Sequence, residues 1–211
     1  MTIPSNIAQV SIDEVQFDAI NRDEIISDFV SKKLLPLLPS EAKIITLDGF
    51  DGVGKSTISR LMSHMLGIPH INLDDYLVKA RGCFVDAVKK TDLKEAMEQS
   101  LIQERRVVVE GCMVDDVLET IDMESQFRIY VMRTARMYSN ADDERVREEV
   151  LYGDESTSYF IASHEETVRG AAQSSDRGGT GERGCLRKEL ILYHRKKRPQ
   201  DRANLIIKVV D

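Results

Sequence analysis

Gly49-Phe50-Asp51-Gly52-Val53-Gly54-Lys55-Ser56 is the stretch that decides the fold of this 211-residue chain. It satisfies the pattern G-x-x-x-x-G-K-[ST] of a phosphate-binding loop, or P-loop. Glycines let backbone N–H groups turn inward around an anion, and the N-terminus of a following helix adds its positive dipole end. We therefore expect a nucleotide site built from Gly49, Asp51, Gly52, Val53, Gly54, Lys55, Ser56 and Thr57.

Two of these residues have a defined chemical part in such a loop. Lys55 is expected to reach the β- and γ-phosphates, and the Ser56 hydroxyl is placed to bind Mg²⁺. The flanking sequence supports the motif, because the β-branched run Lys43–Asp48 precedes it. Apolar residues then recur at helical spacing from Ile58 to Leu66, and Gly67 and Pro69 end that helix. This strand–loop–helix context makes a chance match in a glycine-rich turn improbable.

The same alternation of strand and helix continues along the chain. Further strands are expected at 70–73, 107–110, 127–132 and 204–210, with helices at 92–105 and from 186 onward. Strands that alternate with helices predict a parallel sheet covered on both faces, joined by right-handed crossovers. The fold class is therefore α/β, a three-layer P-loop domain with a five-stranded parallel sheet.

The expected domain organisation has three parts. Residues 1–40 are interpreted as an N-terminal helical extension, because Asn21 and Glu24 resemble a capping pair ahead of an apolar stripe that Pro36 ends. Residues 41–133 and 186–211 form the core, and no element is assigned to residues 1–20. Residues 134–185, which hold a charged run, a helix and a Ser/Gly-rich stretch, are interpreted as a mobile insertion that closes as a lid. An inert surface loop is the open alternative.

Composition limits the compartment and the classes of partner that are expected for such a protein. The net charge of −7 gives no overall attraction to nucleic acid or to an anionic membrane. The apolar runs are too short to cross a bilayer, and the N-terminus lacks the pattern of a signal peptide. Cys83, Cys112 and Cys185 are widely spaced without CxxC pairing, so reduced thiols are expected. We expect a cytoplasmic protein whose partner is a small-molecule acceptor, with no nucleic acid and no membrane; a homodimer is compatible with the sequence.

Carboxylates follow two of the expected strands. The second strand leads into Asn72-Leu73-Asp74-Asp75-Tyr76, and the third ends at Glu110-Gly111. Ligand chemistry gathers at the carboxyl ends of parallel strands, so these carboxylates should lie beside the P-loop. There Asp74 can accept a proton from a substrate hydroxyl or help to hold a metal ion, and Glu110 can orient Mg²⁺ through water. The alternatives are that one Asp caps the next turn, and that Glu110 is a plain strand-end residue.

These motifs together resemble the uridine kinase-like group, which includes nicotinamide riboside kinases and phosphoribulokinases. That group combines a DGxxGxGKST loop, a D-D-F-[FY]-type motif and an apolar strand ending in E-G; the counterparts here are Asp48–Thr57, Asp74–Tyr76 and Val107–Gly111. The resemblance implies the strand order 2-3-1-4-5, Asp74 as the base that activates the acceptor hydroxyl, and Glu110 as a magnesium-site acid. It also implies that Asp75 and Tyr76 contact the substrate. In the tail, Asn204 replaces the Asp that usually precedes the last strand.

The sequence departs from the group at the lid. Its members usually carry an arginine-rich R-x-x-R-D-x-x-x-R-G segment, and this chain has Arg133 and Arg136 near that place. These two are the candidates for touching the transferred phosphate. The loop alone also resembles that of thymidylate kinases, whose arginine-containing R-E-P-G-G segment is missing. A guanine-reading NKxD motif is missing too, which argues against a GTPase.

The function that these features favour is a kinase that uses ATP and Mg²⁺ to phosphorylate a hydroxyl of a nucleoside-like or sugar-like small molecule. Two alternatives stay open. A nucleoside monophosphate kinase would need arginines where Asp74-Asp75-Tyr76 stands. A regulatory nucleotide-binding protein with weak ATPase activity would fit the sparse lid arginines. The four histidines, including His70 and His194, lack metal-ligand spacing and are expected to be surface or core residues.

Overall fold

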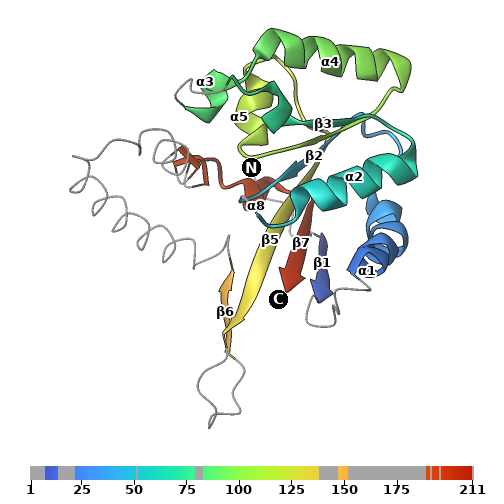
Figure 1. The fold of residues 1–211 in the computed structure, drawn as a ribbon, viewed down its shortest axis with the longest axis vertical. Coiled ribbons are helices and arrows are strands. Elements are labelled where there is room, and N and C mark those ends of the chain that lie inside the picture. The colour runs from blue at the N-terminus through green and yellow to red at the C-terminus, as the bar shows by residue number, and fades with distance from the viewer. Residues whose placement is uncertain are drawn as a thin grey trace, which may run out of the picture.

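The structure is a computed structural model that describes residues 8–13, 22–50, 52–78, 83–137, 147–151, 189–190, 192–194 and 196–210. Its centre is one twisted sheet with the strand order β1-β7-β5-β2-β4-β3, and β6 pairs with β5 outside this path (Figure 1). The strands are β1 (Ala8–Asp13), β2 (Ile44–Asp48), β3 (His70–Asn72), β4 (Val107–Glu110), β5 (Phe127–Met137), β6 (Arg147–Leu151) and β7 (Leu205–Val210).

The expected order of the five core strands is confirmed. In chain order they are β2, β3, β4, β5 and β7, and the sheet arranges them as 2-3-1-4-5. Their pairings are parallel, with Leu47 opposite both Glu110 and Ile129. All five residues of β2 are buried, as the strand lies in the middle of the sheet with neighbours on both sides. This explains its continuous β-branched and apolar run, which has no polar face to show.

Helices cover both faces of the sheet (Figure 1). Right-handed crossovers place α1 (Arg22–Phe29) and α2 (Lys55–Leu66) on one face, since both lie in connections that run toward β3. They place α4 (Lys90–Gln103) and α5 (Val114–Glu119) on the other face, because those connections run back toward β7. Short helical segments also occur at 30–34, 35–37, 73–76, α3 (Phe84–Ala87) and α8 (Pro199–Arg202).

The N-terminal part contributes more than a helix. The apolar stripe predicted before Pro36 does enter the core, where Ile26, Phe29, Val30 and Leu34 are buried. In addition, β1 adds a parallel edge strand beside β7, in a segment for which the sequence predicted no element. The signal was the alternation in Gln9-Val10-Ser11-Ile12, which has the period of two residues typical of a half-buried strand. The sequence did not predict β1 because the alternating run is short and polar residues surround it.

The structure also differs from the prediction after residue 132, where the sequence predicted that β5 ends. β5 continues to Met137, beyond the predicted Met132, and pairs with the antiparallel strand β6. β6 begins inside the charged run 142–149, which the sequence assigned to a solvated insertion. The strand form of this charged run comes from its pairing with β5, which no local pattern in the run specifies. Residues 138–146 and 152–188 lie outside the described part, so the lid, the helix and the Ser/Gly-rich stretch expected there stay predictions, as do the three domain boundaries.

Among the described residues, no helix is long and apolar enough to cross a membrane. The longest described helix is α4, and it carries charged residues along its length.

Candidate nucleotide and acceptor site

The P-loop joins the end of β2 to the start of α2, where the sequence places it. Gly49 has φ +148°, and a Cβ atom built on it would lie 2.2 Å from the carbonyl oxygen of Val131. Gly54 has φ +98° and is the N-cap residue of α2. Both conformations favour glycine, so the loop's path depends on these residues. The result is the strand–loop–helix geometry in which backbone N–H groups and a helix N-terminus meet an anion.

Lys55 opens α2 and is buried, with 6% of its surface exposed. Its ammonium group donates to the carbonyl oxygens of Gly49 at 3.0 Å and of Phe50 at 2.7 Å. It also lies 3.8 Å from Cys112 Sγ, the thiol that follows the β4 end. Lys55 is thus folded back onto the loop by two carbonyls, in a position from which its amine can turn to a phosphate.

Glu110 ends β4 beside the first turn of α2. Only 2% of it is exposed, and one carboxylate oxygen, Oε1, has no hydrogen-bond partner among the described residues. Burial raises the pKa of Glu110, while a hydrogen bond with the Ser56 hydroxyl and the charge of Lys55 lower it. A buried carboxylate next to a hydroxyl and at a loop that cradles phosphates is the oxygen-donor environment that Mg²⁺ takes. The two predicted metal-site residues, Ser56 and Glu110, are therefore together, and they fit the ion.

Asp74 stands on the 3₁₀ turn Leu73–Tyr76 that follows β3. The Asn72 side chain caps this turn by accepting the backbone N–H of Asp74 at 2.9 Å. Asp74 is exposed, and its charge raises the pKa of Glu110, so the two carboxylates lie close enough to interact. Because β3 and β4 pair in parallel with Asn72 opposite Glu110, both reach the same edge of the sheet.

Asp75 and Tyr76 lie on the same turn but face a different environment. Burial raises the pKa of the Tyr76 hydroxyl, and the charges of Asp75 and Asp92 raise it further. The Asp75 charge also raises the pKa of His70, although burial and Arg60 have the larger, lowering effect on that histidine. The Asp75 charge thus acts on His70 and Tyr76, whereas the Asp74 charge acts on Glu110.

The remaining predicted residues divide into two groups. Val53 is buried, while Gly52 and Thr57 are exposed on the loop and the first turn of α2. Asp51 lies outside the described residues. Arg133 and Arg136 lie on β5, three and six residues past Tyr130, which pairs with Asp48 at the base of the P-loop. Their backbone is therefore at the P-loop edge of the sheet, and their contact with phosphate stays a prediction.

His70 lies beside Glu110, a contact that the sequence did not predict. Its Nε2 atom is 2.9 Å from the Ser59 hydroxyl and 4.0 Å from Glu110 Oε1. The two parallel strands β3 and β4 bring it there from the edge of the sheet. Its spacing in the sequence gives no metal-ligand pattern, so the contact could be found only from the pairing of the strands.

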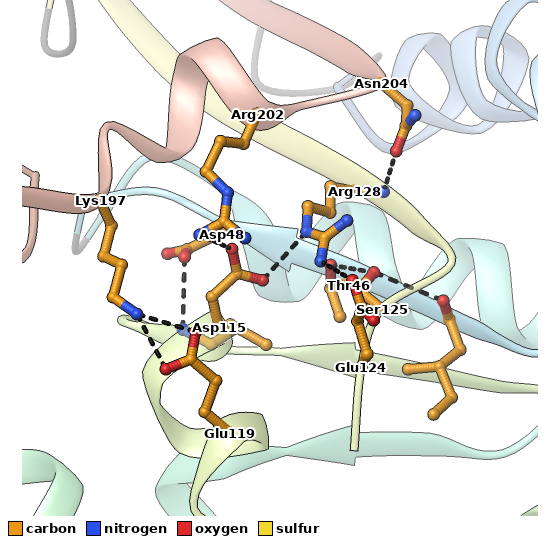
Figure 2. A network of polar contacts seen from close by, with 12 residues as sticks. Thr46, Asp48, Asp115, Glu119, Glu124, Ser125, Arg128, Lys197, Arg202 and Asn204 are labelled. Carbon is orange, nitrogen blue, oxygen red and sulfur yellow. Dashed lines mark hydrogen bonds and ion pairs between the residues drawn. The ribbon is translucent and has the colours of Figure 1, made fainter. Parts of the chain in front are cut away.

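A second set of residues that the sequence did not assign lies beneath the P-loop. Asp48, at the end of β2, is buried and accepts hydrogen bonds from the backbone N–H of Gly49 and of Val114 and from the Tyr193 hydroxyl. The bond to the start of α5 is drawn in Figure 2. Burial raises the pKa of Asp48 to about 6, although its hydrogen bonds and Lys55 act in the opposite direction.

His194 is the neighbour of Tyr193 and is also buried. Its ring stacks on Phe50 of the P-loop, with ring centroids 4.0 Å apart and 15° between the planes. Nδ1 lies 2.8 Å from the carbonyl oxygen of Leu190, which can only accept, so Nδ1 carries the proton and Nε2 accepts from the Tyr130 hydroxyl at 3.1 Å. Burial lowers the pKa of His194 to about 4, which keeps this arrangement neutral at pH 7. The expectation of a core histidine holds.

A cavity of about 420 Å³ lies away from the P-loop, between α5 and the segments that begin β5 and precede β7. It is bordered by a network of ion pairs in which Arg128 contacts Asp115 and Glu124, and Arg202 contacts Asp115 (Figure 2). Arg128 pairs with Thr46 in the sheet, two residues before the end of β2, so the cavity borders the half of the sheet that leads up to the loop. The cavity is therefore not the phosphate cradle.

Fold and site together define the class of this protein as a P-loop α/β protein with the 2-3-1-4-5 strand order. No model of a known protein family matches the chain. A shikimate kinase from Geobacter metallireducens is 36% identical over 50 residues, which are 24% of this chain and 28% of that enzyme. The chain thus matches little more than a quarter of the length of this curated relative.

One solved structure, described as a possible uridine kinase from Bacillus stearothermophilus, aligns with a TM-score of 0.45 and 12% sequence identity. The alignment covers 87% of this chain and 98% of that one.

Proposed function

We propose that this protein is a phosphotransferase that moves the γ-phosphoryl group of Mg-ATP to a hydroxyl of a small molecule. The observation that carries the proposal is the placement of Asp74: an exposed carboxylate at the same sheet edge as buried Glu110 and the P-loop residues Lys55 and Ser56. A simple nucleotide-binding module has no need of an exposed carboxylate beside its phosphate cradle. A kinase needs one, to receive the proton of the attacking hydroxyl.

The P-loop residues would position the donor. The loop between β2 and α2 and the N-terminus of α2 would bind the phosphates, and Lys55 would exchange its loop carbonyls for phosphate oxygens. Ser56 and Glu110 would hold the magnesium ion, Ser56 directly and Glu110 through water. When bound, Mg²⁺ supplies positive charge that neutralises the phosphate oxygens. Catalysis of this kind is mostly positioning and electrostatic stabilisation.

Asp74 would act on the acceptor. Its carboxylate accepts the proton of the acceptor hydroxyl while that oxygen forms a bond to the γ-phosphorus. The bond between the γ-phosphorus and the β–γ bridging oxygen breaks, and ADP leaves with that oxygen. Asp75 and Tyr76 extend from the same turn and are proposed to contact the acceptor, and Arg133 and Arg136 are proposed to face the transferred group.

Two sources suggest which classes of acceptor to test. The motif resemblance suggests a nucleoside or a riboside, and the local match to a shikimate kinase suggests a cyclic polyol acid. All of these carry secondary or primary hydroxyls that a carboxylate can deprotonate during transfer. A nucleoside monophosphate, the other acceptor class, would need cationic partners, and the turn 73–76 carries two carboxylates.

The experiment is an acceptor panel. The full chain is incubated with Mg-ATP and, in turn, uridine, nicotinamide riboside, pentoses, hexoses, shikimate and nucleoside monophosphates, and both ADP and the phosphorylated product are measured. We expect ADP production that depends on one hydroxyl acceptor, with the product carrying one added phosphate. ATP binding without transfer to any compound would instead support a regulatory nucleotide-binding protein.

A further inference from the structure

The Asp48 carboxylate joins three segments that are far apart in the sequence. Oδ1 accepts the N–H of Gly49 at 2.7 Å, Oδ2 accepts the N–H of Val114 at 3.3 Å, and Oδ2 also accepts the Tyr193 hydroxyl. We name these four residues the Asp48 network. It connects the first residue of the P-loop, the start of α5 and the described helical residues 189–190, 192–194 and 196–197 that precede β7.

The Asp48 network leads directly to the lysine of the nucleotide site. Asp48 accepts the backbone N–H of Gly49, and this bond orients the Gly49 peptide. The carbonyl oxygen of Gly49 then accepts the Lys55 ammonium group at 3.0 Å. Gly49 has little freedom to compensate, because its Cα faces the Val131 carbonyl at close range. A change in the position of the Asp48 carboxylate should therefore move the backbone of Gly49, and with it the carbonyl oxygen that holds Lys55.

A second contact from the same helical residues reaches the next residue of the loop. His194 stacks on Phe50, whose side chain is 4% exposed, and His194 is itself held by Leu190 and Tyr130. Successive residues, Tyr193 and His194, thus support successive positions of the loop, one through Asp48 and one through Phe50. Nothing in the P-loop pattern itself requires either contact.

We infer that Tyr193 is a positioning residue for the nucleotide site, which acts by holding Asp48 and thereby the backbone of Gly49 in the conformation that receives phosphate. The inference rests on the proposed function to the extent that nucleotide binds at the P-loop. A loop held in its binding conformation loses less conformational freedom when the ligand arrives, so the affinity is higher. The Tyr193 hydroxyl supplies this effect from a residue that touches neither nucleotide nor metal.

Because charged groups surround Asp48, the effect of the Tyr193 hydroxyl on nucleotide affinity should depend on pH. The groups that face it are Tyr193, Lys55 of α2, Asp115 of α5 and Tyr130 of β5. Removing the Tyr193 hydroxyl removes a hydrogen bond that favours the ionised carboxylate, so the pKa of Asp48 rises above about 6. A protonated Asp48 has fewer acceptor sites for the N–H groups of Gly49 and Val114. As the pH is lowered, the affinity of the Tyr193→Phe variant for nucleotide should therefore begin to fall at a higher pH than that of the wild type.

The experiment compares Tyr193→Phe with the wild type and with a matched control, Lys197→Met. Phenylalanine keeps the buried ring and removes the hydroxyl alone. Lys197 lies in the same segment and binds Asp116 and Glu119 of α5, so its substitution loosens this segment at a contact with α5. Figure 2 draws the contact with Glu119. The dissociation constant of Mg-ATP is measured by titration calorimetry between pH 6 and 8.5, and circular dichroism gives the folded fraction of each variant.

We expect Tyr193→Phe to raise the dissociation constant of Mg-ATP on the order of tenfold at pH 7, a size typical of coupling between linked sites. The effect should grow toward pH 6 and shrink toward pH 8.5, whereas Lys197→Met should match the wild type at every pH. In an Asp48→Asn background, Tyr193→Phe should add no further loss, because the two substitutions break the same contact.

Three outcomes would overturn the inference, and they are distinguishable. If the wild type binds Mg-ATP and Tyr193→Phe binds it within about twofold across the pH range, the hydroxyl does not position the loop, while the proposed function stands. If Lys197→Met weakens binding as much as Tyr193→Phe, the effect is a general loosening of the segment. If the wild type binds no nucleotide, the proposed function fails and the inference fails with it.

Discussion

At the scale of single residues, the site combines groups whose pKa values are shifted by burial. Burial raises the pKa of both Asp48 and Glu110 and lowers that of His194. Perturbed groups of this kind gather where a protein binds or transfers charge. Here Asp48 bonds to Gly49 and His194 stacks on Phe50, so two of these groups contact the P-loop directly.

His194→Gln tests this linkage through stability. The folded-state pKa of His194 is about 4, below its ordinary value of 6.5, so folding favours the neutral ring. Its contribution to stability is present above pH 6.5 and is lost as the pH falls toward 4, by about 3 kcal/mol for a shift of roughly two and a half units. Urea unfolding of wild type and variant should therefore show a difference in unfolding free energy that shrinks by about this amount between pH 7.5 and 4. A pH-independent difference would mean that His194 titrates normally.

Glu110→Gln tests the magnesium site. The substitution keeps the shape of the buried side chain and removes its charge, so the fold should be retained. We expect affinity for Mg-ATP to fall roughly 10- to 100-fold, as for groups that orient a metal ion through water. Affinity for ATP measured in EDTA should be unchanged. Glu104→Gln, at the exposed end of α4, is the control; equal losses with and without the ion would place Glu110 outside the metal site.

At the scale of elements, short capped turns set the geometry of the acceptor side. The 3₁₀ turn Leu73–Tyr76 is held at its start by Asn72, whose side chain accepts the N–H of Asp74. Behind it, a Cβ atom on Gly111 would lie 2.9 Å from the Leu73 side chain, so the turn packs closely against the end of β4. This packing carries Asp74 to the edge where Glu110 ends.

Asn72→Ala should therefore affect the reaction more than the fold. Loss of a cap of this kind costs about 1 kcal/mol, which corresponds to a fall in melting temperature of roughly 2–4 °C for a chain of this size. The transfer rate should fall severalfold or more, because the turn that carries Asp74 is no longer fixed. Ser100→Ala, which removes a hydrogen bond to Ala96 within α4, is the control for an equal local loss. Equal rates in both variants would show that the cap does not position Asp74.

The elements that could be predicted from the sequence are those with strong local patterns. β2 and β4 were predicted within one residue, and α2 was predicted from Ile58 to its observed end at Leu66, since continuous apolar runs and helical spacing are local signals. β1 and β6 were not predicted, because one lies in a short polar segment and the other in a charged run. Their strand character comes from pairing with β7 and β5, and such pairing is a long-range effect.

The same distinction holds for the site. Lys55, Ser56, Glu110 and Asp74 could be placed together because each follows a predicted strand end, and parallel strands end at one edge. The contact between Asp48 and Tyr193 spans 145 positions in the sequence and follows no motif. It depends on how the last crossover lies on the sheet, which no local pattern specifies.

At the scale of the whole molecule, nucleotide binding should stabilise the fold. Mg-ATP at about a hundredfold excess over its dissociation constant adds roughly 2.7 kcal/mol, or a rise in melting temperature of about 5–10 °C. Lys55→Ala should remove most of this rise, since Lys55 is the buried cation of the loop. Lys94→Ala is the control, because Lys94 is exposed on α4 and pairs weakly with Asp122. A wild type that shows no rise with any nucleotide would contradict the P-loop assignment.

The central claim is that the chain transfers phosphate and does not merely bind nucleotide. Its most direct test is single-turnover transfer of the γ-phosphate with enzyme in excess, for wild type and Asp74→Asn, with the acceptor found in the panel. Asparagine keeps the size of the side chain and cannot accept the proton. The transfer rate should fall about 10²- to 10⁴-fold while the dissociation constant of Mg-ATP stays unchanged. Transfer by Asp74→Asn at the wild-type rate, or tight Mg-ATP binding by the wild type with no transfer at all, would contradict the claim.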